Sequence, residues 1–232
     1  MMPHNIEQDT WKQMAGTAAA KLVEDGMVVG LGTGSTSNFL IYALAQRVQA
    51  GLRITGAISS SQASHDLAAN LGIPVTDLDA HPTLDLYIDG ADEIDTQLNL
   101  LKGAGGALLR EKIVASAARR FIVIADVTKQ VTHLGQNFPV PVEVVPFATT
   151  PVRIHLEALG AAVTTRVIAG KPFVTENGNI ILDCAFSGGI SDPIGLSANM
   201  HRIVGVVETG LFLGMAEQAL IGGPDGVLTL PE

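Results

Sequence analysis

The sequence contains one cysteine, Cys184, among 232 residues, so no disulfide can form within the chain. This cysteine lies in the apolar, strand-like segment 181–186, where we expect a buried and unreactive thiol. Aromatic residues make up only 4% of the chain, so a core has to be built mainly from aliphatic side chains. With 47% hydrophobic and 16% charged residues, the chain can still bury a sizeable core, which argues against disorder.

Targeting segments, membrane spans and positive charge are also lacking. Residues 1–8 have no basic region followed by an apolar run, so we expect no secretory signal. The most apolar long stretch, 203–223, contains Glu208 and Glu217 and is not expected to span a membrane. The net charge of −9 makes nucleic acid and anionic lipid poor partners. We therefore expect a cytoplasmic protein in which any anionic ligand is held by a local positive site.

The first 130 residues alternate between strand-like and helix-like segments. Short apolar strands are predicted at 27–30, 54–58, 84–88 and 121–125, and helices at 37–48, 62–70 and 107–118. This alternation is typical of an α/β fold with a Rossmann-like parallel sheet and helices on both faces.

From residue 131 on, the pattern changes. It predicts a strand at 140–145, a helix at 151–159, a hairpin over 171–183 that turns at Asn177-Gly178, and a helix at 197–203. These elements indicate a smaller α+β domain of the ferredoxin-like type. A strand at 204–213 and a hairpin at 219–230 follow, and the hairpin is expected to rejoin the first sheet. We therefore expect a catalytic domain of 1–130 with 204–232 returning to it, and a small domain of 131–203.

Polar residues gather at the carboxyl ends of the predicted strands, where open parallel sheets bind ligands. The four segments are 32–36, 59–61, 89–92 and 126–129. One such segment is ordinary turn chemistry, but four of them predict a polar crevice that holds a ligand.

The glycine-rich segment 32–36 stands between a strand and a helix, an arrangement that can cradle a phosphate. Glycines let the backbone approach an anion, and Ser35 and Thr36 can add hydroxyl donors. The same residues could instead serve only as a helix cap. A dinucleotide-binding loop is disfavoured, because Ser35 stands where the third glycine is needed and the second strand ends in serines instead of an acid. An ATP-type loop lacks its lysine.

Three acids, Asp89, Asp92 and Glu93, follow the third strand. Carboxylates at this place can accept hydrogen bonds from sugar hydroxyls, act as acid or base, or hold a divalent metal, and they could also form a solvated turn. The six histidines are scattered and form no ligand pair at helical spacing, so we predict no metal site.

Lys102 precedes the glycine-rich loop 103–106, and Glu111 stands one turn into the helix that follows. A lysine before such a loop can lie along the floor of the crevice. The helix dipole and nearby lysines would influence the ionisation of Glu111. Taken alone, however, Glu111 would be interpreted as a surface residue of a helix.

Several strings, taken together and in order, resemble ribose-5-phosphate isomerase of the metal-independent A type. They are GLGTGST at 30–36, YIDGADE at 87–93, KGAGGALLREK at 102–112, IADVTKQ at 124–130, PVEVVP at 141–146, NIILD at 179–183 and GGPDGV at 222–227. Each string is a weak signal by itself. The ordered set covers nearly the whole chain and is highly specific.

The resemblance implies roles for individual residues. Its phosphate and sugar loop falls on Thr33, Gly34, Ser35 and Thr36, and its paired aspartates are Asp89 and Asp92, with Gly90 and Ala91 between them. Its catalytic lysine segment falls on Lys102, Gly103, Ala104 and Gly105, its general base on Glu111, and a further substrate-contacting lysine on Lys129. Lys12 matches a family lysine less closely, and Ala104 replaces a glycine that is usual there.

The implied reaction interconverts D-ribose 5-phosphate and D-ribulose 5-phosphate through an enediolate. Asp89 assists the opening of the sugar ring, Glu111 moves a proton between C2 and C1, and Lys102 with neighbouring N–H groups stabilises the negative oxygen. No cofactor is expected, because no electrons leave the substrate. The resemblance also implies a homodimer or homotetramer whose small-molecule ligand is a pentose 5-phosphate.

Two other functions occur on related folds. A sugar-phosphate-sensing domain would bind similar ligands without catalysis, but it normally follows a DNA-binding module, and only about 25 residues precede the first strand here. A CoA-transferase would need a glutamate nucleophile in a motif that the sequence does not contain. The isomerase is therefore the preferred interpretation.

Overall fold

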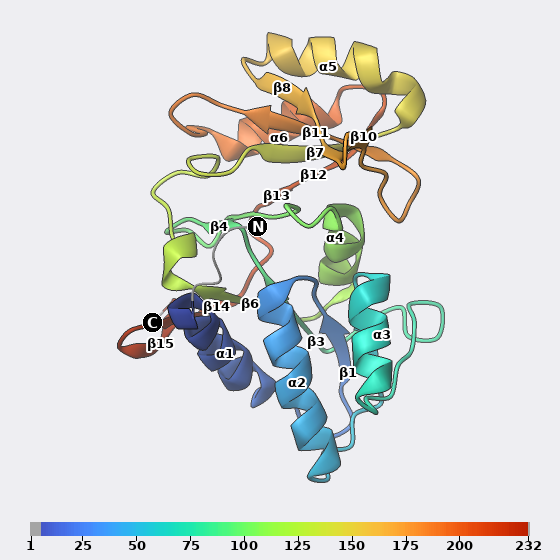
Figure 1. The fold of residues 1–232 in the computed structure, drawn as a ribbon, viewed down its shortest axis with the longest axis vertical. Coiled ribbons are helices and arrows are strands. Elements are labelled where there is room, and N and C mark those ends of the chain that lie inside the picture. The colour runs from blue at the N-terminus through green and yellow to red at the C-terminus, as the bar shows by residue number, and fades with distance from the viewer. Residues whose placement is uncertain (1–5, 232) are drawn as a thin grey trace. The chain divides into compact units, whose positions relative to one another are not determined.

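The structure, a computed structural model, describes residues 6–231 (Figure 1). These residues form two compact units. The first contains the chain up to Gly90, Arg110–Lys129 and the segment from Met215 on, and the second contains Ala91–Leu109 and Gln130–Gly214. Each unit has a hydrophobic core of its own, made mostly of aliphatic side chains.

The first unit is built on a six-stranded sheet with the order β15-β14-β6-β3-β1-β2. The strands are β1 (Val28–Leu31), β2 (Gly56–Ser59), β3 (Leu86–Gly90), β6 (Phe121–Asp126), β14 (Gln218–Gly223) and β15 (Gly226–Leu230). The helices are α1 (Ile6–Ala20), α2 (Ser35–Gln49), α3 (Gln62–Asn70) and α4 (Leu108–Ala117), with a short 3-10 turn, η1 (Val127–Lys129). The strands run parallel except β15, which pairs with β14 as the predicted C-terminal hairpin.

Helices cover both faces of this sheet. Alternate side chains of β1, β3 and β6 pack with apolar residues of α1, α2 and α3 into the first core. Tyr87 lies on the opposite face, where its ring stacks on Phe121 with centroids 4.9 Å apart. A side chain at Gly30 would meet both Tyr87 and Val114 of α4, so α4 covers this second face. The predicted Rossmann-like sheet is confirmed.

The second unit contains a four-stranded antiparallel sheet with the order β12-β7-β11-β8. Its strands are β7 (Val140–Val144), β8 (Ala162–Thr165), β11 (Ile180–Ala185) and β12 (Val206–Thr209), and its helices are α5 (Thr149–Ala158) and α6 (Pro193–His201). The 3-10 turn η2 (Pro146–Ala148) precedes α5. The chain order β7-α5-β8-β11-α6-β12 is the βαββαβ succession of ferredoxin-like domains. Both helices pack on one face, against Val140, Val142 and Val144.

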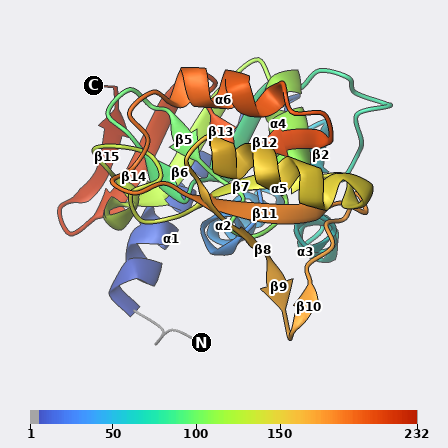
Figure 2. The ribbon, with the colours of Figure 1, turned by 90° about the horizontal axis from the view of Figure 1, so that it is seen from above.

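Two small sheets complete the second unit. β4 (Glu93–Ile94), β5 (Leu100–Leu101) and β13 (Leu211–Phe212) form a three-stranded antiparallel sheet. β9 (Val167–Ile168) pairs with β10 (Lys171–Pro172), and Figure 2 shows this pair as an orange ribbon that projects beyond β8 and β11.

The hairpin predicted over 171–183 is wrong in its pairing. Asn177-Gly178 does form a turn, with Gly178 at φ 78°. β7 and β8, however, flank β11 from Leu182 on, so the preceding segment finds no free edge there and β10 pairs with β9 instead. Among the described residues, the arms of the turn meet at the single bridge of Val174 with Ile180.

Three helices begin earlier than predicted, and one of them, α5, begins at Thr149 instead of residue 151. α2 begins at Ser35 instead of residue 37, and α6 begins at Pro193 instead of residue 197. Asp192 caps α6 by accepting a hydrogen bond from the Gly195 N–H at 2.9 Å, and Pro193 suits the first helical position because its fixed φ is already helical. The Asp-Pro pair was the sequence signal for this start.

The two units divide the chain differently from the predicted domains 1–130 with 204–232 and 131–203. Residues 91–109 group with the second unit, because β4 and β5 pair with β13 and the Val131 N–H donates to the Ile94 carbonyl. Residues 204–214 group there as well, because β12 is an edge strand of the four-stranded sheet. Strand pairing across long sequence separations decides this division.

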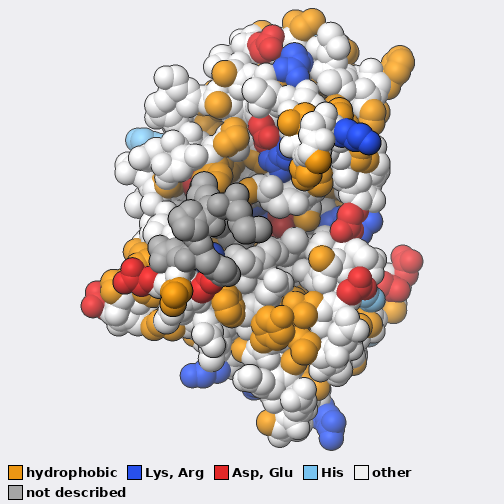
Figure 3. All heavy atoms as spheres, in the orientation of Figure 1, with side chains coloured by type: hydrophobic (Ala, Val, Ile, Leu, Met, Phe, Trp, Pro, Cys, Tyr) orange, Lys and Arg blue, Asp and Glu red, His pale blue; other side chains and the backbone are white. Residues whose placement is uncertain are grey.

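The helices of the described residues include none that is long and apolar enough to cross a membrane. On the face drawn in Figure 3, Lys and Arg side chains are scattered among acidic ones and form no continuous patch. This distribution fits the net charge of −9 and offers no broad basic surface for nucleic acid on that face.

The expected buried thiol is confirmed, since Cys184 on β11 is fully buried. Burial raises the pKa of this thiol to about 12, and the neighbouring charge of Asp183 adds to the effect. The thiol is therefore protonated far above neutral pH and lacks the reactive thiolate.

We expect a thiol reagent such as DTNB to leave the native protein unlabelled at about pH 8 and to label the single thiol of Cys184 after denaturation. Rapid labelling of the native chain would contradict this.

Candidate active site

The carboxyl ends of three neighbouring parallel strands meet at one edge of the first unit's sheet. The loop 32–34 follows β1, Asp89 lies near the end of β3, and Lys129 closes the turn η1 after β6. Parallel strands place their carboxyl ends together, so the structure brings three of the predicted polar segments to one edge within this unit.

The loop after β1 leads directly into α2. Gly34 is the N-cap of this helix and has φ 107°, a left-handed conformation that favours glycine. A glycine N-cap carries no side chain that could bond the N–H groups of the first turn, and this turn contains no acid. Ser35 and Thr36 therefore present their amides at the positive end of the helix, where an anion is favoured.

Asp89 is fully buried and ties the loop to β3. Its Oδ1 accepts hydrogen bonds from the N–H of Thr33 at 3.0 Å, the hydroxyl of Ser37 at 3.0 Å and the N–H of Gly90 at 2.7 Å. Its Oδ2 accepts a hydrogen bond from the hydroxyl of Tyr87 at 2.5 Å. A buried carboxylate is costly unless donors surround it, and these donors also fix its orientation.

Gly32 makes this contact possible. A β-carbon at this position would lie 1.8 Å from Oδ1 of Asp89, far inside the contact distance of the two atoms. The loop can therefore pass close to the carboxylate only with glycine at this position.

The serine-rich segment after β2 supports the loop from its other side. The hydroxyl of Thr33 lies 2.8 Å from that of Ser60 and donates to that of Ser61 at 2.9 Å. Ser64 donates to the carbonyl of Gly32 at 2.7 Å. The N–H and the hydroxyl of Thr33 are thus both engaged within the unit.

Glu111 stands in the first turn of α4 and is almost fully buried. Burial raises the pKa of Tyr87 well above its usual value, and the charges of Asp89 and Glu111 raise it further. The phenol therefore keeps its proton at physiological pH and remains a donor to Asp89. Because both carboxylates act on one phenol, the structure brings Asp89 and Glu111 into the same neighbourhood.

Two lysines complete the predicted set in the first unit. Lys129 is half-buried and follows a turn in which Asp126 accepts the N–H of Thr128 at 3.0 Å. Lys12 on α1 lies 3.7 Å from the carboxylate of Asp9 and is mostly buried, with 17% of its side chain exposed. Lys129 is at the sheet edge that carries the loop, whereas Lys12 lies on α1, where it pairs with Asp9 of the same helix.

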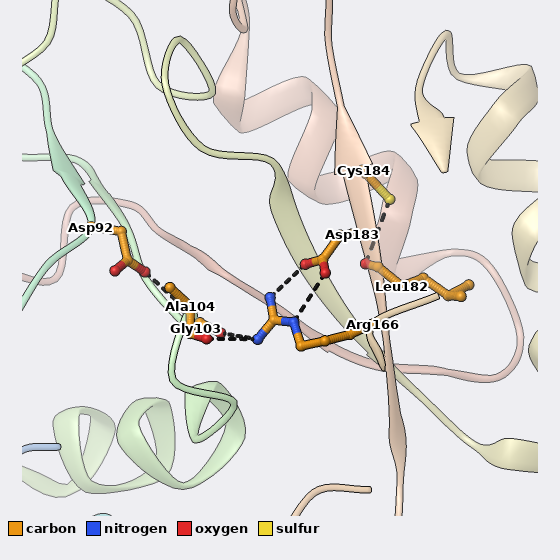
Figure 4. A network of polar contacts seen from close by, with 7 residues as sticks. All are labelled: Asp92, Gly103, Ala104, Arg166, Leu182, Asp183 and Cys184. Carbon is orange, nitrogen blue, oxygen red and sulfur yellow. Dashed lines mark hydrogen bonds and ion pairs between the residues drawn. The ribbon is translucent and has the colours of Figure 1, made fainter. Parts of the chain in front are cut away.

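The remaining predicted residues lie in the second unit, around the loop that follows β5. Oδ2 of Asp92 accepts a hydrogen bond from the N–H of Ala104 at 2.9 Å (Figure 4). Lys102 is buried, and its ammonium lies over the ring of Phe212 at 5.5 Å from the centroid. Ala104 and Gly105 are exposed, so the methyl group of Ala104 does not crowd the core.

Glu93 makes different contacts from Asp89 and Asp92. Its carboxylate accepts hydrogen bonds from the N–H groups of Gly135 at 2.6 Å, Asn137 at 2.5 Å and Phe138 at 3.0 Å. This acid therefore shapes the segment before β7. Within residues 6–231, no group of three or more His, Cys, Asp or Glu side chains is arranged to hold a metal ion.

Residues 56–226 match the family model of ribose 5-phosphate isomerase A, also called phosphoriboisomerase A. The chain belongs to this family. Its sequence is 52% identical over 228 residues to the ribose-5-phosphate isomerase A of Roseiflexus sp. (strain RS-1), with 97% of each covered. Among solved structures, ribose 5-phosphate isomerase A from Methanocaldococcus jannaschii is 39% identical, with a TM-score of 0.91 over 97% of this chain and 99% of that one. A D-ribose-5-phosphate isomerase in complex with phospho-erythronic acid is 37% identical, with a TM-score of 0.93 over the same shares.

Two residues of this isomerase family member escaped the sequence reasoning. Tyr87 opens the motif at 87–93 but is given no role by it, although its position two residues before Asp89 puts both side chains on one face of the strand. Ser37, one helical turn after Thr33, donates to the same carboxylate. Both positions could have been found by asking which donors satisfy a buried aspartate.

The contact between Gly32 and Asp89 generates a prediction. Gly32→Ala should force the loop away from the carboxylate, lower the free energy of unfolding by roughly 1–3 kcal/mol and reduce isomerase activity. Thermal unfolding and a ribose 5-phosphate assay measure the two effects. Gly223→Ala is the matched control, because a β-carbon there meets nothing closer than 3.6 Å. A Gly32→Ala protein as stable and active as wild type would show that the close approach is not needed.

Proposed function

We propose how this chain, an enzyme that interconverts ribose 5-phosphate and ribulose 5-phosphate, carries out its reaction. The activity follows from the family match along most of the chain and favours catalysis over the sensor alternative. The mechanism rests on one observation in particular, the buried cluster of Asp89, Tyr87 and Glu111 at the sheet edge. A coupled assay of ribose 5-phosphate conversion by the purified protein tests the activity directly.

The phosphate of the substrate binds at the N-terminus of α2. The amides of Ser35 and Thr36 and their hydroxyls donate to its oxygens, and Gly34 lets the backbone approach closely. Lys129, which follows β6 two strands along the sheet, adds a positive charge. Such a local site is what a chain with a net charge of −9 needs for an anionic substrate.

Ring opening requires proton transfer at the sugar hydroxyls. Asp89 accepts the proton of the anomeric hydroxyl and returns it to the ring oxygen as the bond between C1 and that oxygen breaks, and Asp92 holds an adjoining hydroxyl while the chain opens. The four donors around Asp89 support this role, because they fix the position of its carboxylate. Asp92 is oriented in turn by the N–H of Ala104.

The isomerisation moves one proton between neighbouring carbons. Glu111 takes the proton from C2, the electron pair left behind forms the C1–C2 double bond, and the π pair of the C1 carbonyl moves onto O1 to give an enediolate. The proton returns at C1 while the hydroxyl proton moves from O2 to O1, which leaves a carbonyl at C2. The near-complete burial of Glu111 supports this assignment, because a site that excludes bulk water protects the enediolate from side reactions.

The negative oxygen of the enediolate is stabilised by Lys102 and by the N–H groups of Gly103 and Gly105, since the N–H of Ala104 already donates to Asp92. The ammonium lies over the apolar ring of Phe212, where its charge is screened less than it would be in water. Phospho-erythronic acid, bound by a related enzyme, carries a planar, negatively charged carboxylate next to a sugar-like chain and a phosphate. That geometry resembles an enediolate and supports the same anchoring for this chain.

The chain acts as a homodimer or homotetramer in the cytoplasm, where its charged substrate is retained. The second unit offers an apolar surface formed by Phe147, which is 98% exposed, Val204, which is 93% exposed, and a hollow of about 760 Å³ beside them. Val145, Ala148 and Pro151 contribute to its walls. A protruding ring beside an apolar hollow suits a two-fold interface, because each copy supplies both features.

Phe147→Glu tests this assembly. The charge should prevent burial of the ring, so the molar mass from light scattering should fall from that of a dimer or tetramer to that of one chain. Ile194→Glu is the control, because this residue is also exposed in the second unit but does not line the hollow. A wild-type monomer, or an unchanged mass for Phe147→Glu, would contradict the proposed interface.

Glu111→Gln tests the proton transfer. Glutamine keeps the size of the side chain but cannot accept the C2 proton, so kcat should fall by at least ~10²–10⁴-fold while KM changes little. Wild-type enzyme should also exchange deuterium at C2 of ribose 5-phosphate with solvent, and the variant should not.

The exposed glutamate Glu157 on α5 provides the control Glu157→Gln, which should keep wild-type kcat. If Glu111→Gln still exchanges the label at nearly the wild-type rate, another carboxylate is the base and the assignment of Glu111 is wrong.

A further inference from the structure

Arg166 joins the sheet of the second unit to the loop that carries Ala104. It lies between β8 and β9, and its guanidinium donates to both carboxylate oxygens of Asp183 on β11, at 3.0 Å and 2.5 Å (Figure 4). Its remaining nitrogen donates to the carbonyl of Gly103 at 2.6 Å and to that of Ala104 at 3.0 Å. One planar side chain therefore bridges a strand and a loop more than 60 residues apart in sequence.

The contacts of Arg166 and Asp92 fall on the same peptide group. The carbonyl of Gly103 and the N–H of Ala104 belong to one peptide plane and point in opposite directions. A guanidinium holds the oxygen end and a carboxylate holds the N–H end. Rotation of this plane by half a turn would aim the carbonyl oxygen at Asp92 and the N–H at Arg166, so the charges on both sides select one orientation.

The arrangement is largely shielded from water. The side chains of Arg166 and Asp183 are 14% and 15% exposed, so their interaction is screened less than that of a surface ion pair. Asp183 alternates along β11 with Leu182 and Cys184, which belong to the core under the helices, so it points to the other face of the sheet. The planar fork of arginine can bind a carboxylate and two carbonyls at once, whereas the ammonium of lysine is a point charge without this geometry.

We propose that Arg166, held by Asp183, is a positioning residue for the isomerisation. It fixes the 103–104 peptide so that the N–H of Ala104 holds Asp92 in its working orientation. The guanidinium also polarises the peptide, which makes that N–H a stronger donor. The inference rests on the proposed role of Asp92 in ring opening, and it gives Arg166 a part in the reaction that acts through Asp92.

Four single variants test the proposal. Arg166→Met removes the charge and the fork, and kcat should fall by about 10- to 100-fold with KM little changed, because the reacting groups are misplaced while the phosphate anchor is intact. Arg166→Lys should recover part of the lost kcat, and Asp183→Asn should lower kcat less than Arg166→Met does.

Arg153→Met is the matched control, because Arg153 in the same unit donates to the carbonyl of Val163 at 2.5 Å and not to the loop. It should keep wild-type kcat with a similar change in thermal stability.

A double-variant cycle separates the positioning role from the proposed function. If Arg166 acts through Asp92, then Arg166→Met combined with Asp92→Asn should be no slower than Asp92→Asn alone. Wild-type kcat in Arg166→Met, or losses that multiply in the double variant, would overturn the inference while Asp92 keeps its role. If Asp92→Asn keeps wild-type kcat, Asp92 has no role in ring opening, and Arg166 cannot act through it. Should Arg166→Met fail to fold, the same cycle with Arg166→Lys decides between these outcomes.

Discussion

The hydrogen bonds that surround the carboxylate of Asp89 are the constraint on which the rest of the site depends. A carboxylate with no exposed surface needs donors, and here they come from the loop after β1, from the first turn of α2 and from the preceding strand residue Tyr87. Satisfying this one charge therefore sets the path of the loop, the start of α2 and the rotamer of Tyr87. The proposed phosphate anchor and Asp89, the proposed proton acceptor of ring opening, are built by the same contacts.

Two other charged side chains shape the second unit in a similar way. Glu93 accepts hydrogen bonds from three backbone N–H groups of the segment before β7, and Arg166 donates hydrogen bonds to two carbonyls of the loop after Lys102. In each case a largely buried charge is compensated by main-chain groups that no helix or strand has paired. Irregular segments thus acquire fixed shapes without any regular hydrogen-bond ladder.

The fold was largely predictable, because hydrophobic periodicity and turn residues are local signals. Apolar runs separated by helical patterns predicted the parallel sheet, and α3 was predicted with the bounds that the structure shows. The differences from the prediction lie where pairing partners compete. The turn at Asn177-Gly178 was predicted correctly, but the edges of β11 were already occupied, and residues 91–109 joined the second unit through β4 and β5.

For the site, the ordered motifs by themselves determined the family, the reaction and the set of candidate residues from Thr33 to Lys129. Short motifs can do this because the chemistry needs particular residue types at fixed local spacings, such as glycines before a helix or acids at a strand end. Tertiary structure alone decided which carboxylate is surrounded by hydrogen-bond donors. It also decided that Arg166 binds the carbonyl of the peptide whose N–H donates to Asp92. The cause is physical: hydrogen-bond partners more than 50 residues apart are chosen by packing of the strands, and no local pattern in the sequence encodes that choice.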